Sequence, residues 1–324
     1  MIKNMNICQV SLIGNLPILM ENIVNFNKYY KKNNFYIICP KKEKKFFLKK
    51  FKKKNIKIIP EENLINFSKF KKISNYYLKK TTYFNEIQNR LKWYYQQILK
   101  ITFIIDFVEN KNKNIIIWDA DTILIKKIIF FKEKYSCYYG TTSYFHKAYY
   151  KTNNYILGHM PKYFISSLAQ FIGATPSEIK FLVKQLKKKQ NRCSNTGEWL
   201  THIIIKSIVK AHNSYNGSLF SEYELIGQSN LNFNYKKQIL VSGIRDNLNG
   251  KLTPLQIKII KFLGFKYIAY EHTHPNSNSN GMLKRDQTWL KFINILIKKQ
   301  SNNLFRGLKH HLNYFFRLFK PTIW

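Results

Sequence analysis

Short apolar runs alternate with amphipathic stretches along the first part of the chain. Residues 7–13 (ICQVSLI) and 34–40 (NFYIICP) are apolar runs that end near glycine or proline, which is typical of strands. Between them, residues 16–32 place apolar side chains at the spacing of one helix face. The lysine-rich residues 41–57 repeat this spacing and lead into a third short strand at 55–60. An order of strand, helix and strand predicts a parallel α/β sheet.

The run NIIIWDADTILIKK at residues 114–127 is the strongest strand signal in the chain. It follows a predicted helix over residues 89–107 and a polar break, KNKN. A central parallel strand is buried on both faces, so its sequence is continuously apolar rather than alternating. The pattern therefore predicts a central strand that ends abruptly at two carboxylates, Asp119 and Asp121.

The later segments have weaker patterns. Residues 161–189 resemble a pair of helices, the second of them capped by Thr175 or Ser177. The other expected elements are a strand in 137–145, helices in 197–212 and 254–264, a strand in 266–272, and appended helices from residue 283 onward. We therefore expect two units, a main domain over residues 1–282 and a helical tail over residues 283–324.

The chain is strongly basic. Its 55 lysines and arginines against 17 acidic residues give a formal charge of +38, while hydrophobic residues make up 45%. That apolar content excludes a disordered basic tail protein. A basic protein commonly binds nucleic acid or an anionic membrane, but only six of the basic residues are arginines, and nucleic-acid readers favour arginine. An AT-rich genome also produces an excess of Lys, Asn, Ile, Tyr and Phe, so both interpretations stay open.

The four cysteines lie far apart in the sequence, at positions 8, 39, 137 and 193. They form no CxxC pair, so we expect neither a zinc cluster nor a disulfide framework. Residues 1–20 lack the apolar core of a signal peptide, and no run approaches the roughly 18 apolar residues of a membrane span. The sequence predicts a cytoplasmic protein, either free or peripheral on the inner face of the cytoplasmic membrane.

The carboxylates of Asp119 and Asp121 are the main candidates for chemistry. Ligands of open α/β sheets bind beyond the carboxyl ends of the strands, where the predicted strand delivers both residues. Side chains two positions apart on an extended segment point the same way, and paired carboxylate oxygens suit Mg²⁺ or Mn²⁺ shared with substrate phosphates. The arrangement predicts a metal-bound diphosphate ligand, although a DxD also occurs by chance in solvated loops.

Four segments in order give the sequence a family resemblance. They are NRLKWYYQQILK at 89–100, IIIWDADTILIKK at 115–127, YILGHM at 155–160 and SEYELIGQ at 221–228. With its WYxQQ, DxDT and SEYELxG motifs, the chain resembles a family of largely uncharacterised bacterial glycosyltransferases of the GT-A, or nucleotide-diphospho-sugar transferase, type. The resemblance implies a GT-A-like, Rossmann-related α/β fold, in which a mostly parallel sheet is flanked by helices and followed here by a C-terminal helical extension.

The resemblance also implies roles for individual residues. Asp119 and Asp121 match the metal-binding pair, with Asp121 as the direct ligand and Asp119 as a contact to ribose or a ligand through water. The residues that match the helix bordering the nucleotide pocket are Arg90, Lys92, Trp93, Gln96 and Gln97. For Trp93 and its aromatic neighbours core packing is the simpler interpretation, whereas the two glutamines are polar groups on an apolar helix and favour a site.

Glu222 and Glu224, in the SEYE segment, are the only acidic residues between Glu198 and Asp246. An inverting transferase needs one carboxylate to deprotonate the acceptor hydroxyl. We assign this base to Glu222, and donor or substrate binding to Glu224. Glu198 is the rival base, and simple pairing with lysines is the alternative for either carboxylate.

Three histidines are candidates for the site. His159 matches a histidine of the family and is expected to contact the donor or the metal, with a hydrogen-bonded core histidine as the alternative. His272 and His274 have a spacing compatible with metal binding, but they lie in a predicted loop with no further ligand. They are left out of the site.

Residues 301–324 combine leucine and phenylalanine at helical spacing with arginine and lysine. A basic amphipathic helix with a terminal tryptophan is typical of a membrane-surface anchor, and docking on the protein's own core is the equal alternative. If the tail is the anchor, deleting residues 301–324 releases the folded protein from anionic vesicles.

These observations favour a metal-dependent glycosyltransferase that uses Mn²⁺ or Mg²⁺. Its donor would be a nucleotide-diphosphate sugar, UDP-linked by family habit, and its acceptor a hydroxyl of a bacterial surface glycan such as lipooligosaccharide or capsule. A hexosyl- or N-acetylhexosaminyltransferase is expected, with no nucleic-acid partner. The alternatives are a basic nucleic-acid-binding protein and a metal-dependent phosphohydrolase.

Overall fold

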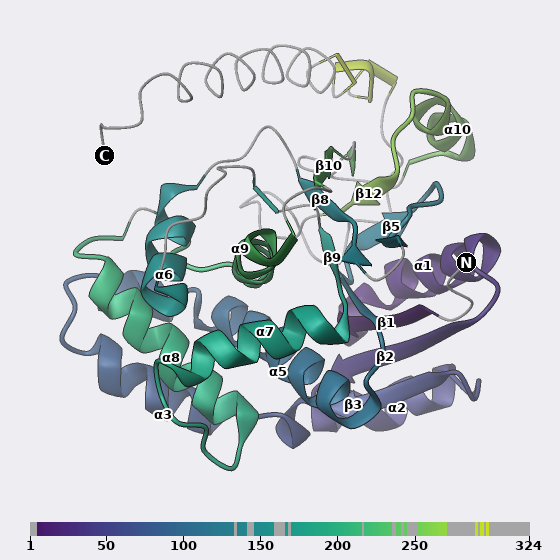
Figure 1. The fold of residues 1–324 in the computed structure, drawn as a ribbon. Helices are drawn as coiled ribbons and strands as arrows, with labels where there is room; N and C mark the ends of the chain where they lie inside the picture. The colour runs from purple at the N-terminus through teal and green to yellow at the C-terminus, as the bar shows by residue number, and fades with distance from the viewer. Residues whose placement is uncertain are drawn as a thin grey trace.

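The computed structural model describes residues 5–132, 135–140, 146–158, 166–167, 170–215, 217–234, 238–240, 243–244, 252–270, 289–290, 292–294 and 296–297. Its centre is a five-stranded sheet in the order β3-β2-β1-β4-β9 (Figure 1). The strands are β1 Met5–Val10, β2 Asn33–Cys39, β3 Ile56–Pro60, β4 Ile115–Trp118 and β9 Phe171–Ala174. The first four are parallel, and β9 runs antiparallel to β4. The predicted α/β class with a mostly parallel sheet is confirmed.

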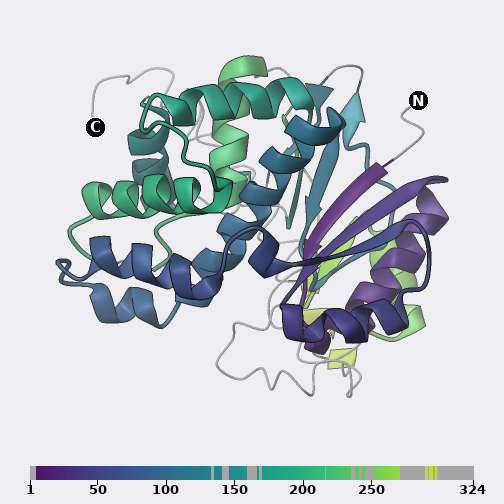
Figure 2. The same ribbon diagram turned by 90° about the horizontal axis from the view of Figure 1, so that it is seen from below.

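β4 is buried on both faces, as its apolar sequence predicts. Ile115 and Ile117 point into a core shared with helix α5 (Leu91–Lys111). Ile116 and Trp118 point into the opposite core, shared with α1 (Leu16–Tyr29) and α2 (Lys44–Lys50). Figure 2 shows these two helical layers on opposite sides of the sheet. Because both faces of β4 are covered, only the end of the strand is available to a ligand.

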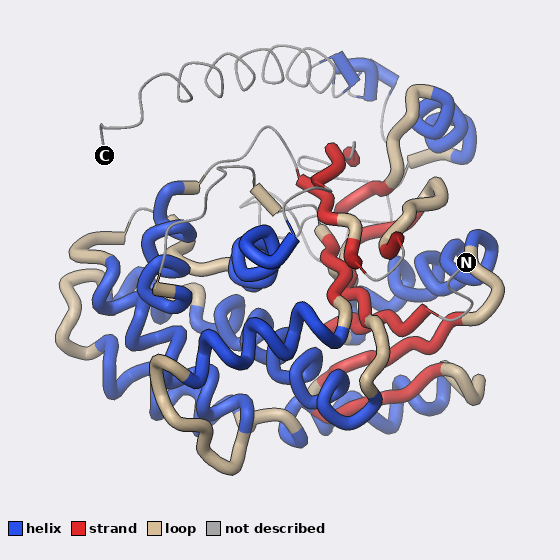
Figure 3. Tube along the Cα trace, viewed as in Figure 1, coloured by secondary structure: helices blue, strands red, loops and turns tan. Residues whose placement is uncertain are grey.

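Most of the helices gather on the α5 side of the sheet (Figure 3). α3 and α6 pack against α8, and α7 packs against α9. Thr175 caps α7 in a capping box with Glu178, which confirms one of the two predicted caps. The helices of this layer are α3 Phe67–Leu78, α4 Phe84–Gln88, α6 Lys147–Leu157, α7 Pro176–Lys187, α8 Thr196–Ala211 and α9 Glu222–Asn234.

A small second sheet lies beyond the end of β4. It has the order β11-β12-β5, with β12 antiparallel to β5 and parallel to β11. Its elements and the helix before β12 are β5 Thr122–Leu124, β11 Gly243–Ile244, α10 Pro254–Phe262 and β12 Tyr267–Ala269. Two further strand pairs join β6 Phe131–Lys132 to β7 Tyr135–Ser136, and β8 Tyr138–Gly140 to β10 Gln238–Leu240.

One predicted helix is wrong. The pattern of residues 161–189 favours two helices, but residues 171–174 form β9, paired with β4 from Phe171↔Trp118 onward. The Phe171 ring stacks on the Trp118 ring with the centroids 4.9 Å apart. Packing against a buried partner strand decides this segment, because β-structure depends on tertiary context more than helices do. Residues 161–165 and 168–169 lie outside the described residues.

The predicted boundary at residue 282, and residues 301–324 of the predicted tail, lie outside the described residues. Within the tail, Phe292 is buried and belongs to the same core cluster as Ile260 of α10. In the part of the chain that the structure describes, no helix combines the length and apolarity that crossing a membrane requires.

Candidate functional site

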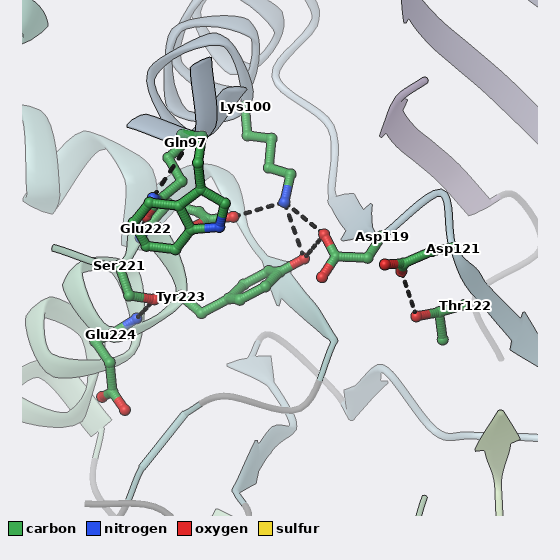
Figure 4. Close-up of polar contacts among 10 residues, drawn as sticks. Gln97, Lys100, Asp119, Asp121, Thr122, Ser221, Glu222, Tyr223 and Glu224 are labelled. Carbon is green, nitrogen blue, oxygen red and sulfur yellow. Dashed lines mark hydrogen bonds and ion pairs between the residues drawn. The ribbon is translucent and has the colours of Figure 1, made fainter. Parts of the chain in front are cut away.

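The chain turns sharply where β4 ends. The backbone N–H of Thr122 donates to the carbonyl of Asp119 at 3.1 Å, and the indole N–H of Trp118 donates to the carbonyl of Thr122 at 2.7 Å. The prediction that Asp119 and Asp121 lie on an extended segment is therefore wrong, because the backbone hydrogen bond closes a turn around them. The turn still brings the two carboxylates together, close enough for Asp119 to raise the pKa of Asp121 (Figure 4).

Asp121 is a partly buried carboxylate without an ionic partner among the described residues. Burial, and secondly the charge of Asp119, raise its pKa to about 7. The hydroxyl of Thr122 donates to its Oδ1 at 3.1 Å, and no ion pair in the described ranges involves it. A cation placed beside such a carboxylate stabilises its ionised form.

Lys100 is the cation at the centre of the site. Its Nζ donates to Oδ1 of Asp119 at 2.5 Å and to Oε1 of Glu222 at 2.7 Å. The side chain is only 5% exposed, and burial alone lowers the pKa of Lys100. The two carboxylates outweigh that effect and raise the pKa above its usual value. The lysine is therefore charged, and it joins α5, the turn after β4 and the start of α9.

Tyr223 completes this network. Its hydroxyl donates to Oδ1 of Asp119 at 2.6 Å, and Nζ of Lys100 lies 4.9 Å from the centroid of its ring. Burial, together with the charges of Asp119 and Glu222, raises the pKa of Tyr223 well above its usual value. The phenol therefore stays protonated and can donate only to the carboxylate, which fixes the direction of Asp119.

Gln97 fixes the start of α9 against α5. Its Oε1 accepts from the backbone N–H of Glu222 at 3.1 Å, and its side chain is buried. Glu222 is the first residue of α9, where backbone N–H groups have no partner within the helix. Gln97 satisfies one of them, so two predicted site residues from distant segments meet in this contact.

The cluster has a net negative charge in a chain with a formal charge of +38. Lys100 is one positive charge against the carboxyl groups of Asp119, Asp121 and Glu222. Hard carboxylate oxygens suit Mg²⁺ or Mn²⁺. Asp121 has the free carboxylate that such an ion needs, whereas Oδ1 of Asp119 is already occupied by Lys100 and Tyr223.

The residues of the cluster fit a metal ion that takes only one or two of its ligands from the protein. In the described part of the chain, no group of three or more His, Cys, Asp or Glu residues is arranged to hold a metal ion. Mg²⁺ typically uses one or two carboxylates and takes its other ligands from water and substrate phosphates. Asp121, with Asp119 beside it, matches that pattern.

The first turn of α5 lies outside the carboxylate cluster. The guanidinium of Arg90 lies 4.9 Å from the ring centroid of Trp93, which packs against the core beside Tyr94. Lys92 is exposed and Gln96 is partly exposed. No polar contact in the described residues links Arg90, Lys92 or Gln96 to the cluster.

Glu224 also lies apart from the cluster. Its carboxylate is fully buried and accepts from the hydroxyl of Ser166 at 2.6 Å and the backbone N–H of Ser167 at 3.1 Å. Burial raises its pKa to about 7. Positions two apart on a helix point in nearly opposite directions, so Glu224 points away from Lys100 while Glu222 faces it (Figure 4).

The remaining candidates are not brought to the cluster. Glu198, the rival base, lies on α8 and pairs with Lys69 at 2.6 Å. His159 lies outside the described residues, as do His272 and His274.

Sequence reasoning missed Lys100 and Tyr223. Lys100 stands alone in an apolar stretch of α5, between Leu99 and Ile101, which are fully buried. A lone lysine among buried positions is rarely a solvated residue, and that signal was available. Tyr223 lies between two glutamates, and nothing in its spacing distinguishes it from a core aromatic residue.

Solved structures with a similar course of the chain include three glycosyltransferases. The PaToxG glycosyltransferase is 17% identical, with 64% of this chain and 67% of that chain covered and a TM-score of 0.30. The galactosyltransferase LgtC, in complex with donor and acceptor sugar analogs, is 7% identical over 90% of this chain and 95% of that chain, with a TM-score of 0.38. Mouse xyloside xylosyltransferase 1 is 8% identical over 85% of this chain and 99% of that chain, with a TM-score of 0.40.

Comparison of the sequence with curated proteins gives no match. A family model does match, over residues 6–241 of the 324 in the chain. That range includes β4, the turn after it, and the start of α9. The chain belongs to the family described as "Family of unknown function (DUF6492)".

Proposed function

We propose that the chain is a metal-dependent glycosyltransferase with a nucleotide-diphosphate sugar as donor. The observation that carries the proposal is the carboxylate pair, Asp119 and Asp121, at the carboxyl end of β4. Within this pair, Asp119 shares the buried Lys100 with Glu222. A net-acidic cluster at the ligand-binding edge of the sheet, in a chain this basic, is suited to a cation and the diphosphate it accompanies.

A bound Mn²⁺ or Mg²⁺ would neutralise the diphosphate of the donor and favour its departure. Asp121 would hold the ion directly, because its carboxylate has no other ionic partner in the described residues. Asp119, fixed by Lys100 and Tyr223, would contact the water shell of the ion or the ribose of the donor. Lys100 and Tyr223 act here as positioning residues.

Glu222 would act as the base of an inverting transfer. The acceptor hydroxyl gives its proton to the Glu222 carboxylate, the acceptor oxygen forms a bond to the anomeric carbon, and the bond to the diphosphate breaks with its electron pair on the diphosphate. Burial raises the pKa of Glu222, whereas the ammonium of Lys100 lowers it. Lys100 thus favours the ionised form of Glu222, which is the form that accepts a proton.

The finer assignments rest on the resemblance of the WYxQQ, DxDT and SEYELxG motifs. They are a UDP-linked donor, transfer of a hexosyl or N-acetylhexosaminyl group, and a hydroxyl of a lipooligosaccharide or capsule as acceptor. The same resemblance gives Arg90, Lys92, Trp93, Gln96, His159 and Glu224 roles in donor or substrate binding. Such an enzyme would work on the cytoplasmic side of the inner membrane.

The product distinguishes the candidate reactions. Purified protein is incubated with a set of UDP-sugars, Mn²⁺ and a lipooligosaccharide acceptor, and the products are identified by mass spectrometry. Release of UDP with a glycosylated acceptor is expected. Inorganic phosphate or UMP without glycosylated product would favour a phosphohydrolase, and oligonucleotide binding that survives physiological salt would favour a nucleic-acid-binding protein.

The base assignment is tested by a pair of matched variants. Glu222→Gln is expected to lower kcat roughly 10²- to 10⁴-fold, since it removes the proton acceptor but keeps the shape of the side chain. Glu198 is the partly exposed partner of Lys69, and the Glu198→Gln variant is expected to keep the activity of the wild type. The opposite result would transfer the base role to Glu198.

A further inference from the structure

α10 and the C-terminal helical residues 289–290, 292–294 and 296–297 contribute side chains to one core cluster. Ile260 of α10 and Phe292 are both buried in one core cluster, and Leu296 packs against it. Ile268 of β12 belongs to the same cluster. Both segments are therefore anchored to the small sheet. In Figure 1 they lie at the opposite end of the molecule from α3 and α8.

Both segments expose large apolar side chains. On α10 these are Leu255 at 56% and Phe262 at 90% exposure, and its C-cap residue Leu263 is 40% exposed. On the C-terminal helical residues they are Trp289 at 46%, Leu290 at 78%, Ile293 at 45% and Ile297 at 61%. We call these seven side chains the apolar flank. Large apolar side chains exposed on elements of one core cluster favour an interaction surface over ordinary protein surface.

The two segments that carry the apolar flank contain charged residues of one sign only. Residues 252–270 and 289–297 contain no aspartate or glutamate, and their sequence has four lysines, of which Lys258, Lys261 and Lys266 are among the described residues. No ion pair within the described ranges involves these lysines. Burial and the charge of Lys126 lower the pKa of Lys266. The surface therefore combines apolar side chains with uncompensated positive charge.

This surface is joined to the candidate active site by short ordered connections. β12 pairs with β5 directly after the turn, and the backbone N–H of Tyr270 donates to the carbonyl of Asp121 at 2.8 Å. A binding partner that contacts the apolar flank would thus also restrict the motion of the turn that carries Asp121.

We propose that the apolar flank docks the protein on the surface of an anionic lipid bilayer. Apolar side chains would enter the boundary between head groups and acyl chains, and lysines beside them would contact anionic head groups. A bilayer matches both properties at once, whereas a second copy of this strongly basic chain would bring like charges together. The proposal concerns the described face on α10, not residues 301–324, and it does not depend on the transfer reaction.

Vesicle sedimentation of the full chain tests the proposal. Wild type is mixed with vesicles of phosphatidylcholine alone or of phosphatidylcholine with phosphatidylglycerol. The variant Phe262→Ser/Leu290→Ser removes the two most exposed side chains of the flank, and their exposure leaves the fold intact. The matched control is Tyr76→Ser on α3, a side chain that is 74% exposed but far from the flank in sequence and fold.

Wild type is expected to bind the anionic vesicles and not the neutral ones, and binding is expected to weaken with salt. The double variant should bind at least about tenfold more weakly, and Tyr76→Ser should bind as wild type does. Lys258→Glu/Lys266→Glu should weaken binding by roughly tenfold or more, since each lysine near an anionic surface strengthens binding by about fivefold.

Three results would overturn the proposal. The first is absence of wild-type binding to the anionic vesicles. The second is unchanged binding of Phe262→Ser/Leu290→Ser, which would assign any membrane contact to residues 301–324. The third is a concentration-dependent dimer that the double variant abolishes while vesicle binding is absent, which would make the flank a protein interface.

Discussion

The ammonium of Lys100 lies 2.5 Å from Oδ1 of Asp119, and the two side chains are only 5% and 19% exposed. The same ammonium lies 2.7 Å from Glu222, so one lysine of α5 holds carboxylates from the turn after β4 and from the start of α9. Three segments that are far apart in the sequence therefore depend on one cation for their arrangement.

Removing that cation should be strongly destabilising. Lys100→Met leaves two buried carboxylates without a partner, and breaking a buried ion pair in this way costs about 3–5 kcal/mol of the free energy of unfolding. Chemical denaturation measures the loss. Lys69→Met is the control, because it removes the lysine of a largely exposed pair with Glu198, which should cost less than about 1 kcal/mol.

A double variant separates the missing charge from the missing packing. Lys100→Met/Glu222→Gln removes the positive charge together with one of the carboxylates left behind, so it should recover part of the loss. A double variant that loses the sum of the two single effects would show that Lys100 and Glu222 are not coupled.

Glu224 should make the stability of the protein depend on pH. Its pKa is about 7 in the folded protein against an ordinary 4.5, so the folded state binds the proton more tightly than the unfolded state. The stabilisation is complete below pH 4.5 and is lost as pH rises through 7, at about 1.4 kcal/mol per pH unit and about 3 kcal/mol in all.

Glu224→Gln removes this dependence with little change of shape. The Nε2 of Gln228 lies 3.4 Å from Oε2 of Glu224, and Oε1 of Gln228 has no partner among the described residues. A half-turn of the Gln228 amide would let that oxygen accept from a protonated Glu224 or from a glutamine at 224. The wild type should lose stability relative to Glu224→Gln between pH 5 and pH 8. Parallel pH curves for the two proteins would refute the assignment.

Gly227 allows α9 to lie close to the side chain of Ser167. A Cβ at position 227 would lie 2.6 Å from Cβ of Ser167 and still nearer to its hydroxyl. Alanine normally stabilises a helix by about 1 kcal/mol relative to glycine, but here Gly227→Ala should destabilise by about 1–3 kcal/mol because of overpacking.

A second substitution tests the steric explanation. Ser167→Gly removes the atoms that the new methyl group would meet, so Gly227→Ala should cost less in that background. Gly14→Ala is the control, since nothing lies within 4 Å of its Cβ position. An equal cost of Gly227→Ala with and without Ser167 would contradict the packing.

The sequence predicts the sheet better than it predicts the site. The continuous apolar run of 115–118 is enough to identify a strand buried on both faces, and the carboxylates after it follow from the abrupt end of the run. The segment at 171–174 is not predictable in the same way, because only its contact with β4 makes Phe171 a strand residue.

Side-chain direction explains the rest of the difference at the site. The sequence treats Glu222 and Glu224 as a pair, but helical geometry turns one toward Lys100 and the other toward Ser166. Lys100 itself depends on contacts between segments far apart in the chain, and no local pattern states which carboxylates will meet it.

Asp121 and the cluster around it are proposed to bind a divalent metal together with a nucleotide diphosphate. Isothermal titration of UDP into the 324-residue chain, with Mn²⁺ and with EDTA, measures this directly. Binding should require Mn²⁺, and Asp121→Asn should weaken it at least as much as the roughly 10- to 100-fold loss typical of an outer-shell partner. Asp106→Asn, which changes a carboxylate in the C-terminal half of α5 that pairs with Arg192, should bind as wild type does. Equal UDP binding in EDTA, or unchanged affinity of Asp121→Asn, would contradict the account.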